Sequence, residues 1–114
     1  MVQHSLIAML EFYHQGIISL EQIVDRMCHA PADIFGIEQR GYICEGYYAD
    51  LVLVDLNNSW TVNSDNILYK CKWSPFEGIT YHSKVTHTMV NGNLVYDNGK
   101  FHKSSAGMRL RFNH

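Results

Sequence analysis

The sequence predicts an α+β protein with helices in its first third and strands in the remainder. Apolar residues recur at helical spacing up to residue 36, short β-branched runs follow, and Asn-Gly turns separate the later runs. The length of 114 residues fits one domain, and 46% apolar with 18% charged residues is typical of a folded chain. We therefore divide the chain into a helical segment 1–36, a β-rich segment 37–102 and a loosely held tail 103–114.

The first predicted helix covers residues 5–15. Ser5 can cap its start, and Gly16 can end it in the left-handed conformation. Its apolar face consists of Leu6, Met9, Leu10 and Tyr13.

The second predicted helix begins with a capping box, in which Ser19 is the N-cap and Gln22 the third helical residue. A separate short helix is expected from Pro31 to Phe35, because proline favours the first helical position and Gly36 can close the helix. The apolar stripe of the second helix consists of Leu20, Ile23, Val24 and Met27.

Short strands are expected after residue 50. The apolar run Leu51–Val54 is continuous, which predicts a strand covered on both faces. Asn91-Gly92 joins the strand-like runs 85–90 and 93–96, which predicts a hairpin with a type I′ turn. A second turn at 97–99 then leads into a third short strand at 100–102.

Charge and cysteine usage exclude several classes of protein. The net charge is −2 and Lys and Arg form no cluster, so we expect neither nucleic acid nor a membrane as a partner. No apolar run approaches the roughly 20 residues of a membrane span. The N-terminus lacks a basic leader, and the three cysteines, Cys28, Cys44 and Cys71, include no Cys-x-x-Cys pair. These features predict a cytoplasmic protein with reduced thiols.

The residues alone reveal no catalytic constellation. No two of the seven histidines are two to four positions apart, so surface or hydrogen-bonded histidines are favoured over a composite metal site. Asp50 and Asp55 could form an acid–base pair, but a role in flanking the strand between them is favoured. Trp73, Phe76 and Tyr81 could form a ligand platform, but core aromatics are favoured. We expect no catalytic, cofactor-binding or metal-ligating residue in this chain.

Several strings nevertheless follow the order of one enzyme family. Three stretches match a pattern that many amidohydrolases share. They are Pro31-Ala32, Phe35-Gly36-Ile37 and the spaced residues of Gly41–Val52. The string Ser-Pro-Phe-Glu-Gly at residues 74–78 narrows the match to the dihydroorotases and close relatives such as the allantoinases. Lys72 and Trp73 before it, and the start Gln3-His4-Ser5-Leu6, favour the dihydroorotases. From about residue 2 to about residue 112, the chain resembles the C-terminal region of the dihydroorotases, which are cyclic amidohydrolases.

This resemblance implies a fold in which a (β/α)₈ barrel lies beside a small β-sandwich built from both ends of the chain. Residues 5–36 would be the last helices that pack on the barrel, and residues 41–102 would be C-terminal strands of a partial sandwich. The barrel itself needs roughly 250 residues and must be absent from this chain.

The resemblance also implies a reaction, the conversion of dihydroorotate to N-carbamoyl-aspartate in pyrimidine biosynthesis, with zinc as the cofactor of the complete enzyme. The metal ligands of the family lie upstream of the matched region, so none maps onto this chain. We therefore expect a structural, catalytically inactive part whose partner is the remainder of the barrel. Gln3 and His4 could stand at the rim of the active site, although packing at the start of the helix is favoured.

The sequence is compatible with two alternatives. The chain could be a stand-alone, non-catalytic scaffold module, or it could be part of an allantoinase or hydantoinase rather than a dihydroorotase. The family continues upstream of Met1, and the N-terminal strands of its sandwich are missing here. An open sheet edge and apolar helix faces would then seek cover, so we expect a homo-oligomer or a swapped arrangement.

Overall fold

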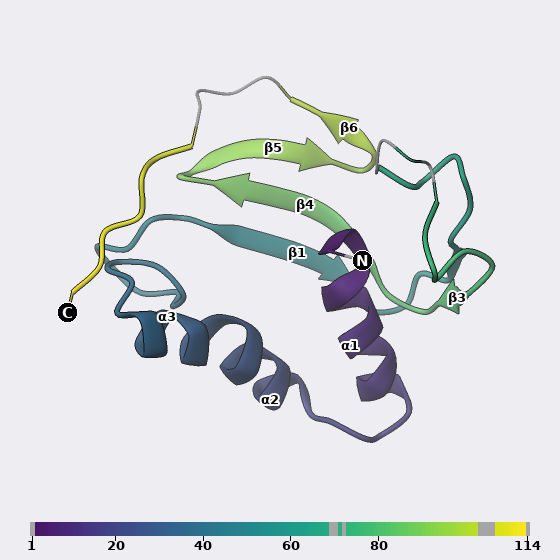
Figure 1. Cartoon of the computed structure of the whole chain (residues 1–114), viewed down its shortest axis with the longest axis horizontal. Helices are drawn as coiled ribbons and strands as arrows, with labels where there is room; N and C mark the ends of the chain where they lie inside the picture. Colours follow the sequence, from purple (N-terminus) through teal and green to yellow (C-terminus); the bar gives the residue numbers. More distant parts are fainter. Residues whose placement is uncertain (1, 69–70, 72, 103–106, 114) are drawn as a thin grey trace. The chain divides into compact units, whose positions relative to one another are not determined.

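The structure of the chain, a computed structural model, describes residues 2–68, 71, 73–102 and 107–113. It divides into two compact units, each made of segments that are far apart in the sequence. The first unit is Met1–Ser19 with Val54–Lys84, and the second is Leu20–Leu53 with Val85–His114. The fold class is α+β, as predicted, and the described residues contain no (β/α)₈ barrel (Figure 1).

The first unit begins with a single helix. A 3₁₀ turn, η1 (Val2–His4), leads directly into α1 (Ser5–His14). Gly16 follows with a φ of 76°, which confirms the predicted left-handed end. The prediction of a Ser5 cap is wrong, because η1 runs up to His4 and His4 therefore occupies the N-cap position.

A two-stranded antiparallel sheet completes the first unit, with β2 (Trp60–Thr61) paired to β3 (Thr80–Tyr81). The buried apolar side chains of this unit are Ile7, Leu10, Val62, Ile67 and Tyr81. Ile7 was absent from the predicted apolar face of the helix, whereas Leu6 and Met9, which belong to that face, are half-buried. The buried face of α1 is therefore rotated from the predicted one, although Leu10 belongs to both.

The second unit contains one continuous helical stretch, formed by α2 (Leu20–Val24), the π-helix η2 (Asp25–His29) and α3 (Ala30–Phe35). The start directly after Ser19 and the end at Gly36, with a φ of 64°, agree with the prediction. The separate helix at Pro31 is wrong, because His29 and Ala30 stay in helical conformation.

The π-helix explains how the helix continues through a proline. The Ala30 N–H donates to the carbonyl of Asp25, five residues back. A proline inside a helix has no N–H to donate and crowds the preceding turn, and a wider π turn relieves such crowding. Among the helices of the described residues, none is long and apolar enough to cross a membrane.

The four-stranded sheet, most of whose residues belong to the second unit, has the strand order β1-β4-β5-β6 (Figure 1). Its strands are β1 (Leu51–Asp55), β4 (Lys84–Val90), β5 (Asn93–Asp97) and β6 (Lys100–Phe101). The pairs β4–β5 and β5–β6 are antiparallel, and the first contains a register shift at Thr88/Met89. Asn91 and Gly92 have φ values of 52° and 81°, which confirms the predicted type I′ turn.

Strand β1 differs from its prediction in its environment. The run was expected to be covered on both faces, but Val52 and Leu53 are 45% and 56% exposed. The prediction of two covered faces is therefore wrong for this chain, although the strand itself lies where it was expected.

The described end of the chain returns to the segment that follows α3. Ile37 forms an antiparallel bridge with Phe112. The Glu38 N–H donates to the Arg111 carbonyl at 2.8 Å, and the Asn113 N–H donates to the Gly36 carbonyl at 2.6 Å. These bonds tie residues 111–113 to residues 36–38, a contact that the expectation of a loosely held tail did not include.

Candidate functional site

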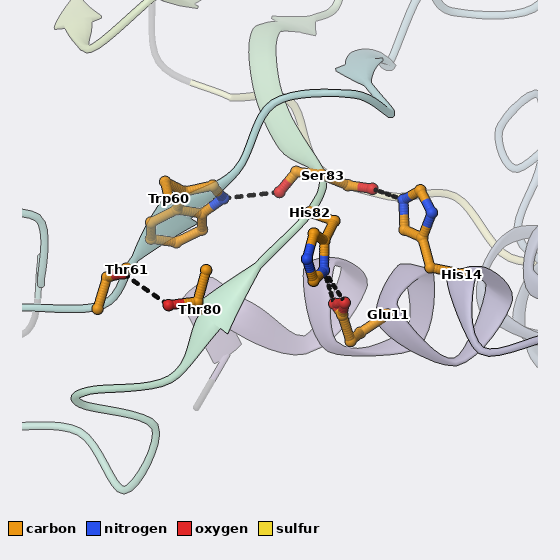
Figure 2. A network of polar contacts seen from close by, with 7 residues as sticks. All are labelled: Glu11, His14, Trp60, Thr61, Thr80, His82 and Ser83. Atoms are coloured by element: carbon orange, nitrogen blue, oxygen red, sulfur yellow. Dashed lines mark hydrogen bonds and ion pairs between the residues drawn. The ribbon is translucent and has the colours of Figure 1, made fainter.

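The first unit contains a cluster of polar side chains where α1 meets the residues that follow β3 (Figure 2). His82 Nδ1 lies 2.5 Å and 3.0 Å from the two carboxylate oxygens of Glu11. His14 Nε2 lies 2.8 Å from the hydroxyl oxygen of Ser83. The rings of His14 and His82 have centroids 5.9 Å apart.

Local geometry explains how these side chains come together. Glu11 and His14 are three positions apart on α1, so both project from the same side of the helix. His82 and Ser83 are consecutive residues directly after β3, and the chain there is held by the Trp60 indole N–H, which donates to the Ser83 carbonyl at 2.6 Å. The hydroxyls of Thr61 and Thr80, 2.7 Å apart, link β2 to β3 beside the cluster (Figure 2).

A cleft of about 560 Å³ adjoins the cluster. It is lined by Glu11, His14, Gln15, Leu56, Asn57, Ser59 and His82. The arrangement does not form a serine hydrolase triad, because the carboxylate binds His82 whereas the serine binds His14. Ser83 is also only 1% exposed, so a substrate could not reach its hydroxyl.

Metal binding is not supported by the described part of the chain. It contains no group of three or more His, Cys, Asp or Glu side chains that could hold a metal ion. The three cysteines are free and exposed. The residues present therefore do not fit the zinc ion that the family resemblance implies for the complete enzyme.

Gln3 and His4, the predicted rim residues, both make contacts within the first unit. The side-chain amide of Gln3 donates to the Asn66 carbonyl at 2.7 Å and accepts from the Leu68 N–H at 2.8 Å. His4 is 1% exposed, and burial lowers the pKa of its imidazole. These contacts hold the start of α1 within the first unit.

The three aromatic residues considered as a ligand platform differ in burial and in ring contacts. Phe76 and Tyr81 join Trp60 and the His4 ring in one cluster, with ring centroids 5.9 to 6.4 Å apart. Trp73 is 63% exposed. The expectation of core aromatics is therefore correct for Tyr81, which is buried, and wrong for Trp73.

Asp50, which precedes β1, and Asp55, its last residue, have separate structural roles. Asp50 forms an ion pair with the buried Arg40 and accepts the Asn91 N–H at 2.8 Å. The guanidinium carbon of Arg40 also lies 4.2 Å from the centre of the Tyr48 ring. Asp55 accepts the N–H of Asn57, two positions along the chain, at 3.0 Å. These contacts favour structural roles over an acid–base pair.

Sequence reasoning missed the cluster of Glu11, His14, His82 and Ser83. The polar pair at spacing three on an otherwise apolar helix was a visible signal for half of it. Nothing local pointed to the other half, because 71 positions separate Glu11 from His82.

The chain is similar to several known enzymes. It is 34% identical over 102 residues to a dihydroorotase from Pyrococcus furiosus, covering 90% of this chain and 24% of the relative. It is 41% identical over 87 residues to a dihydroorotase from Wolbachia sp. subsp. Drosophila simulans, covering 76% and 20%. It is 33% identical over 99 residues to an allantoinase from Desulfitobacterium hafniense, covering 87% and 22%.

The chain is also similar to a solved enzyme structure. An L-hydantoinase (dihydropyrimidinase) from Arthrobacter aurescens matches with a TM-score of 0.76 and 34% identity, covering 83% of this chain and 22% of that chain. The chain thus spans about a fifth to a quarter of the length of the enzymes that it matches. The model of the amidohydrolase family matches residues 1–95. The chain belongs to the amidohydrolase family.

Proposed function

We propose that this chain is the C-terminal part of a cyclic amidohydrolase of the dihydroorotase type, and that it has a structural role. The complete enzyme would interconvert dihydroorotate and N-carbamoyl-aspartate in pyrimidine biosynthesis, in the cytoplasm. The two dihydroorotase relatives support this substrate, together with the Trp-Ser-Pro-Phe-Glu-Gly string at residues 73–78. The helical segment 1–36 would pack on the barrel, and the strands within 37–102 would form part of the sandwich.

The observation that carries the proposal is the apolar surface of the second unit. The exposed apolar side chains on its helices are Val24, Met27, Ile34 and Phe35. Folded proteins rarely expose large apolar patches to solvent. Where one chain does so, the patch marks a surface that another part of the protein or a partner covers. Because the chain spans about a fifth to a quarter of its relatives, we assign the remainder of the barrel as that cover.

No step of the reaction is assigned to residues of this chain. The family resemblance implies that a zinc ion in the complete enzyme would be held by residues upstream of the matched region, and the described residues contain no group that could hold one. Gln3 and His4 remain the candidates for the rim of the active site, through their position at the start of the matched region. Without the remainder of the barrel, the chain would be inactive and would self-associate through its apolar surface.

An allantoinase or hydantoinase activity is the second candidate, because an allantoinase and a hydantoinase structure also match the chain. The complete polypeptide that carries these residues should be purified and assayed with dihydroorotate, allantoin and hydantoin. Turnover of dihydroorotate alone would support the first proposal, and turnover of allantoin or hydantoin would replace it with the second. A native mass near 13.2 kDa, with no turnover, would favour the stand-alone scaffold instead.

The placement of the helices can be tested in the same polypeptide. Val24 is 44% exposed in this chain, so a carboxylate there is tolerable unless the barrel covers it. We expect Val24→Asp to destabilise the complete enzyme by about 3 kcal/mol, through a buried unpaired charge. Arg26→Asp, which puts the same residue at a more exposed position of the helical stretch, is the matched control. An unchanged melting temperature for Val24→Asp would contradict the placement.

A further inference from the structure

The sequence contains two Asn-Gly pairs, and both form tight turns in the second unit. Asn91-Gly92 joins β4 to β5, and Asn98-Gly99 joins β5 to β6. The φ values are 52° and 81° in the first turn and 47° and 92° in the second, so the two turns share one backbone type. Asn-Gly is also the pair in which the glycine nitrogen reaches the asparagine side chain with the least steric hindrance. The two turns therefore offer the same chemistry in different surroundings.

The first turn is held on both of its residues. The Asn91 N–H donates to Asp50 Oδ1 at 2.8 Å, and the Gly92 N–H donates to the Ala49 carbonyl at 3.0 Å. The side-chain oxygen of Asn91 is buried. The nitrogen that would attack is thus already bonded, and the carbonyl group that it would attack is shielded from water.

The second turn is held at its asparagine but not at its glycine. The Asn98 N–H donates to the Thr86 carbonyl at 2.7 Å, and its side-chain amide donates to Asp97 at 3.0 Å. Within residues 2–68, 71, 73–102 and 107–113, the Gly99 N–H has no acceptor. Both turn residues are exposed, and β6 beyond them is an edge strand of two residues. Such an edge opens locally at little cost, which gives the turn access to reactive conformations.

We propose that Asn98 is a site of spontaneous deamidation and that the fold protects Asn91 from the same reaction. The Gly99 nitrogen gives its proton to a base in solvent and attacks Cγ of Asn98. A bond forms between that nitrogen and Cγ, the bond from Cγ to the side-chain nitrogen breaks, and ammonia leaves. Water then opens the resulting succinimide at either carbonyl, which leaves aspartate or isoaspartate at position 98.

The modification would loosen the edge of the sheet. Isoaspartate lengthens the backbone of a two-residue turn, and the pairing of Asp97 with Lys100 requires that turn. The new carboxylate also stands beside Asp97, whose own carboxylate lies 3.1 Å from His87 Nε2. We therefore expect β6 to detach from β5 in the modified chain.

Both sites can be measured in one peptide of the natural polypeptide that carries this chain. Residues 85–100 include Asn91 and Asn98, and their only Lys or Arg is the final Lys100. Because Lys84 precedes them, trypsin releases both sites in one peptide. The folded protein is incubated in mildly alkaline buffer, and fragment-ion mass spectrometry assigns the replacement of NH₂ by OH to either position. The first turn has one additional backbone hydrogen bond, at the attacking Gly92 nitrogen. One such bond is worth roughly fivefold in an opening equilibrium, so we expect position 98 to react about fivefold faster.

Two controls test the structural cause. In concentrated urea the fold is lost, and the two positions should react at similar rates. Asp50→Ala removes the acceptor of the Asn91 N–H and should raise the rate at position 91 without changing position 98. Equal rates in the folded protein, a faster reaction at position 91, or a rate ratio that persists in urea would overturn the proposal. Absence of reaction at position 98 under conditions that modify the unfolded chain would overturn it as well.

Discussion

Asp50 should contribute far more to stability than Asp55, although the two residues lie at opposite ends of the same strand. Asp50 pairs with Arg40, whose side chain is only 9% exposed, and it also accepts the Asn91 N–H at the β4–β5 turn. Within the described part of the chain, the exposed Asp55 carboxylate has one hydrogen-bond donor, the N–H of Asn57. Replacing each aspartate by alanine therefore removes two anchoring contacts in one case and a local turn contact in the other.

The expected magnitude follows from these contacts. Removing one partner of a fully buried ion pair costs roughly 3–5 kcal/mol, because the other charge is left unpaired. The Asp50 side chain is 34% exposed, so solvent screens the pair, and we reduce this contribution to about 2 kcal/mol. The hydrogen bond from Asn91 adds about 1 kcal/mol. We expect Asp50→Ala to lower the free energy of unfolding by about 3 kcal/mol, and Asp55→Ala by about 0.5 kcal/mol.

Urea unfolding followed by circular dichroism measures both variants against the parent protein. Asp50→Asn separates the two contributions, because it keeps an acceptor for the Asn91 N–H but loses the charge that pairs with Arg40. It should lie between the parent and Asp50→Ala. Equal unfolding midpoints for Asp50→Ala and Asp55→Ala would refute the reasoning.

Two further predictions concern Gly36, which contacts Asn113 near the C-terminal end, and His4 near the start of the chain. At Gly36 a β-carbon would lie 2.6 Å from the Asn113 carbonyl oxygen, whereas at Gly46 it would meet nothing within 4 Å, and both glycines have positive φ. Gly36→Ala should therefore cost about 1–3 kcal/mol more than Gly46→Ala in urea unfolding, and equal costs would contradict the contact. Burial lowers the pKa of His4, so the folded state binds fewer protons than the unfolded state. The free energy of unfolding should fall as pH drops below the ordinary histidine value of 6.5, and His4→Leu should reduce that slope. An identical pH dependence in parent and variant would exclude this contribution.

The sequence predicted best the features that neighbouring residues determine. The Asn91-Gly92 turn and the left-handed glycines at Gly16 and Gly36 follow from backbone sterics over a few positions, and the structure contains all three. Pro31 shows the limit of this local reasoning. A preference for the first turn of a helix does not reveal that the preceding helix can continue through a π turn.

Contacts between distant segments could not be predicted in the same way. The pairing of Glu11 with His82 depends on how α1 packs beside β3, which no local pattern encodes. The return of Phe112 to Ile37 is of the same kind, since both lie in irregular segments without strand periodicity. For the candidate site, the sequence provided individual residue types, while their association required the tertiary structure.

Asp50 connects the stability of the second unit with the chemistry of its turns. Its carboxylate neutralises the buried Arg40 and, through Asn91, holds the turn whose asparagine we expect to resist deamidation. If this account is correct, Asp50→Ala must lower the unfolding free energy and raise the deamidation rate at position 91 together. Asp50→Asn should lower stability through the lost charge but leave position 91 largely protected, because its amide oxygen still accepts the Asn91 N–H. A variant in which position 91 reacts in proportion to the loss of stability alone would show that global unfolding controls the reaction. The local hydrogen bond from Asn91 to Asp50 would then have no protective role.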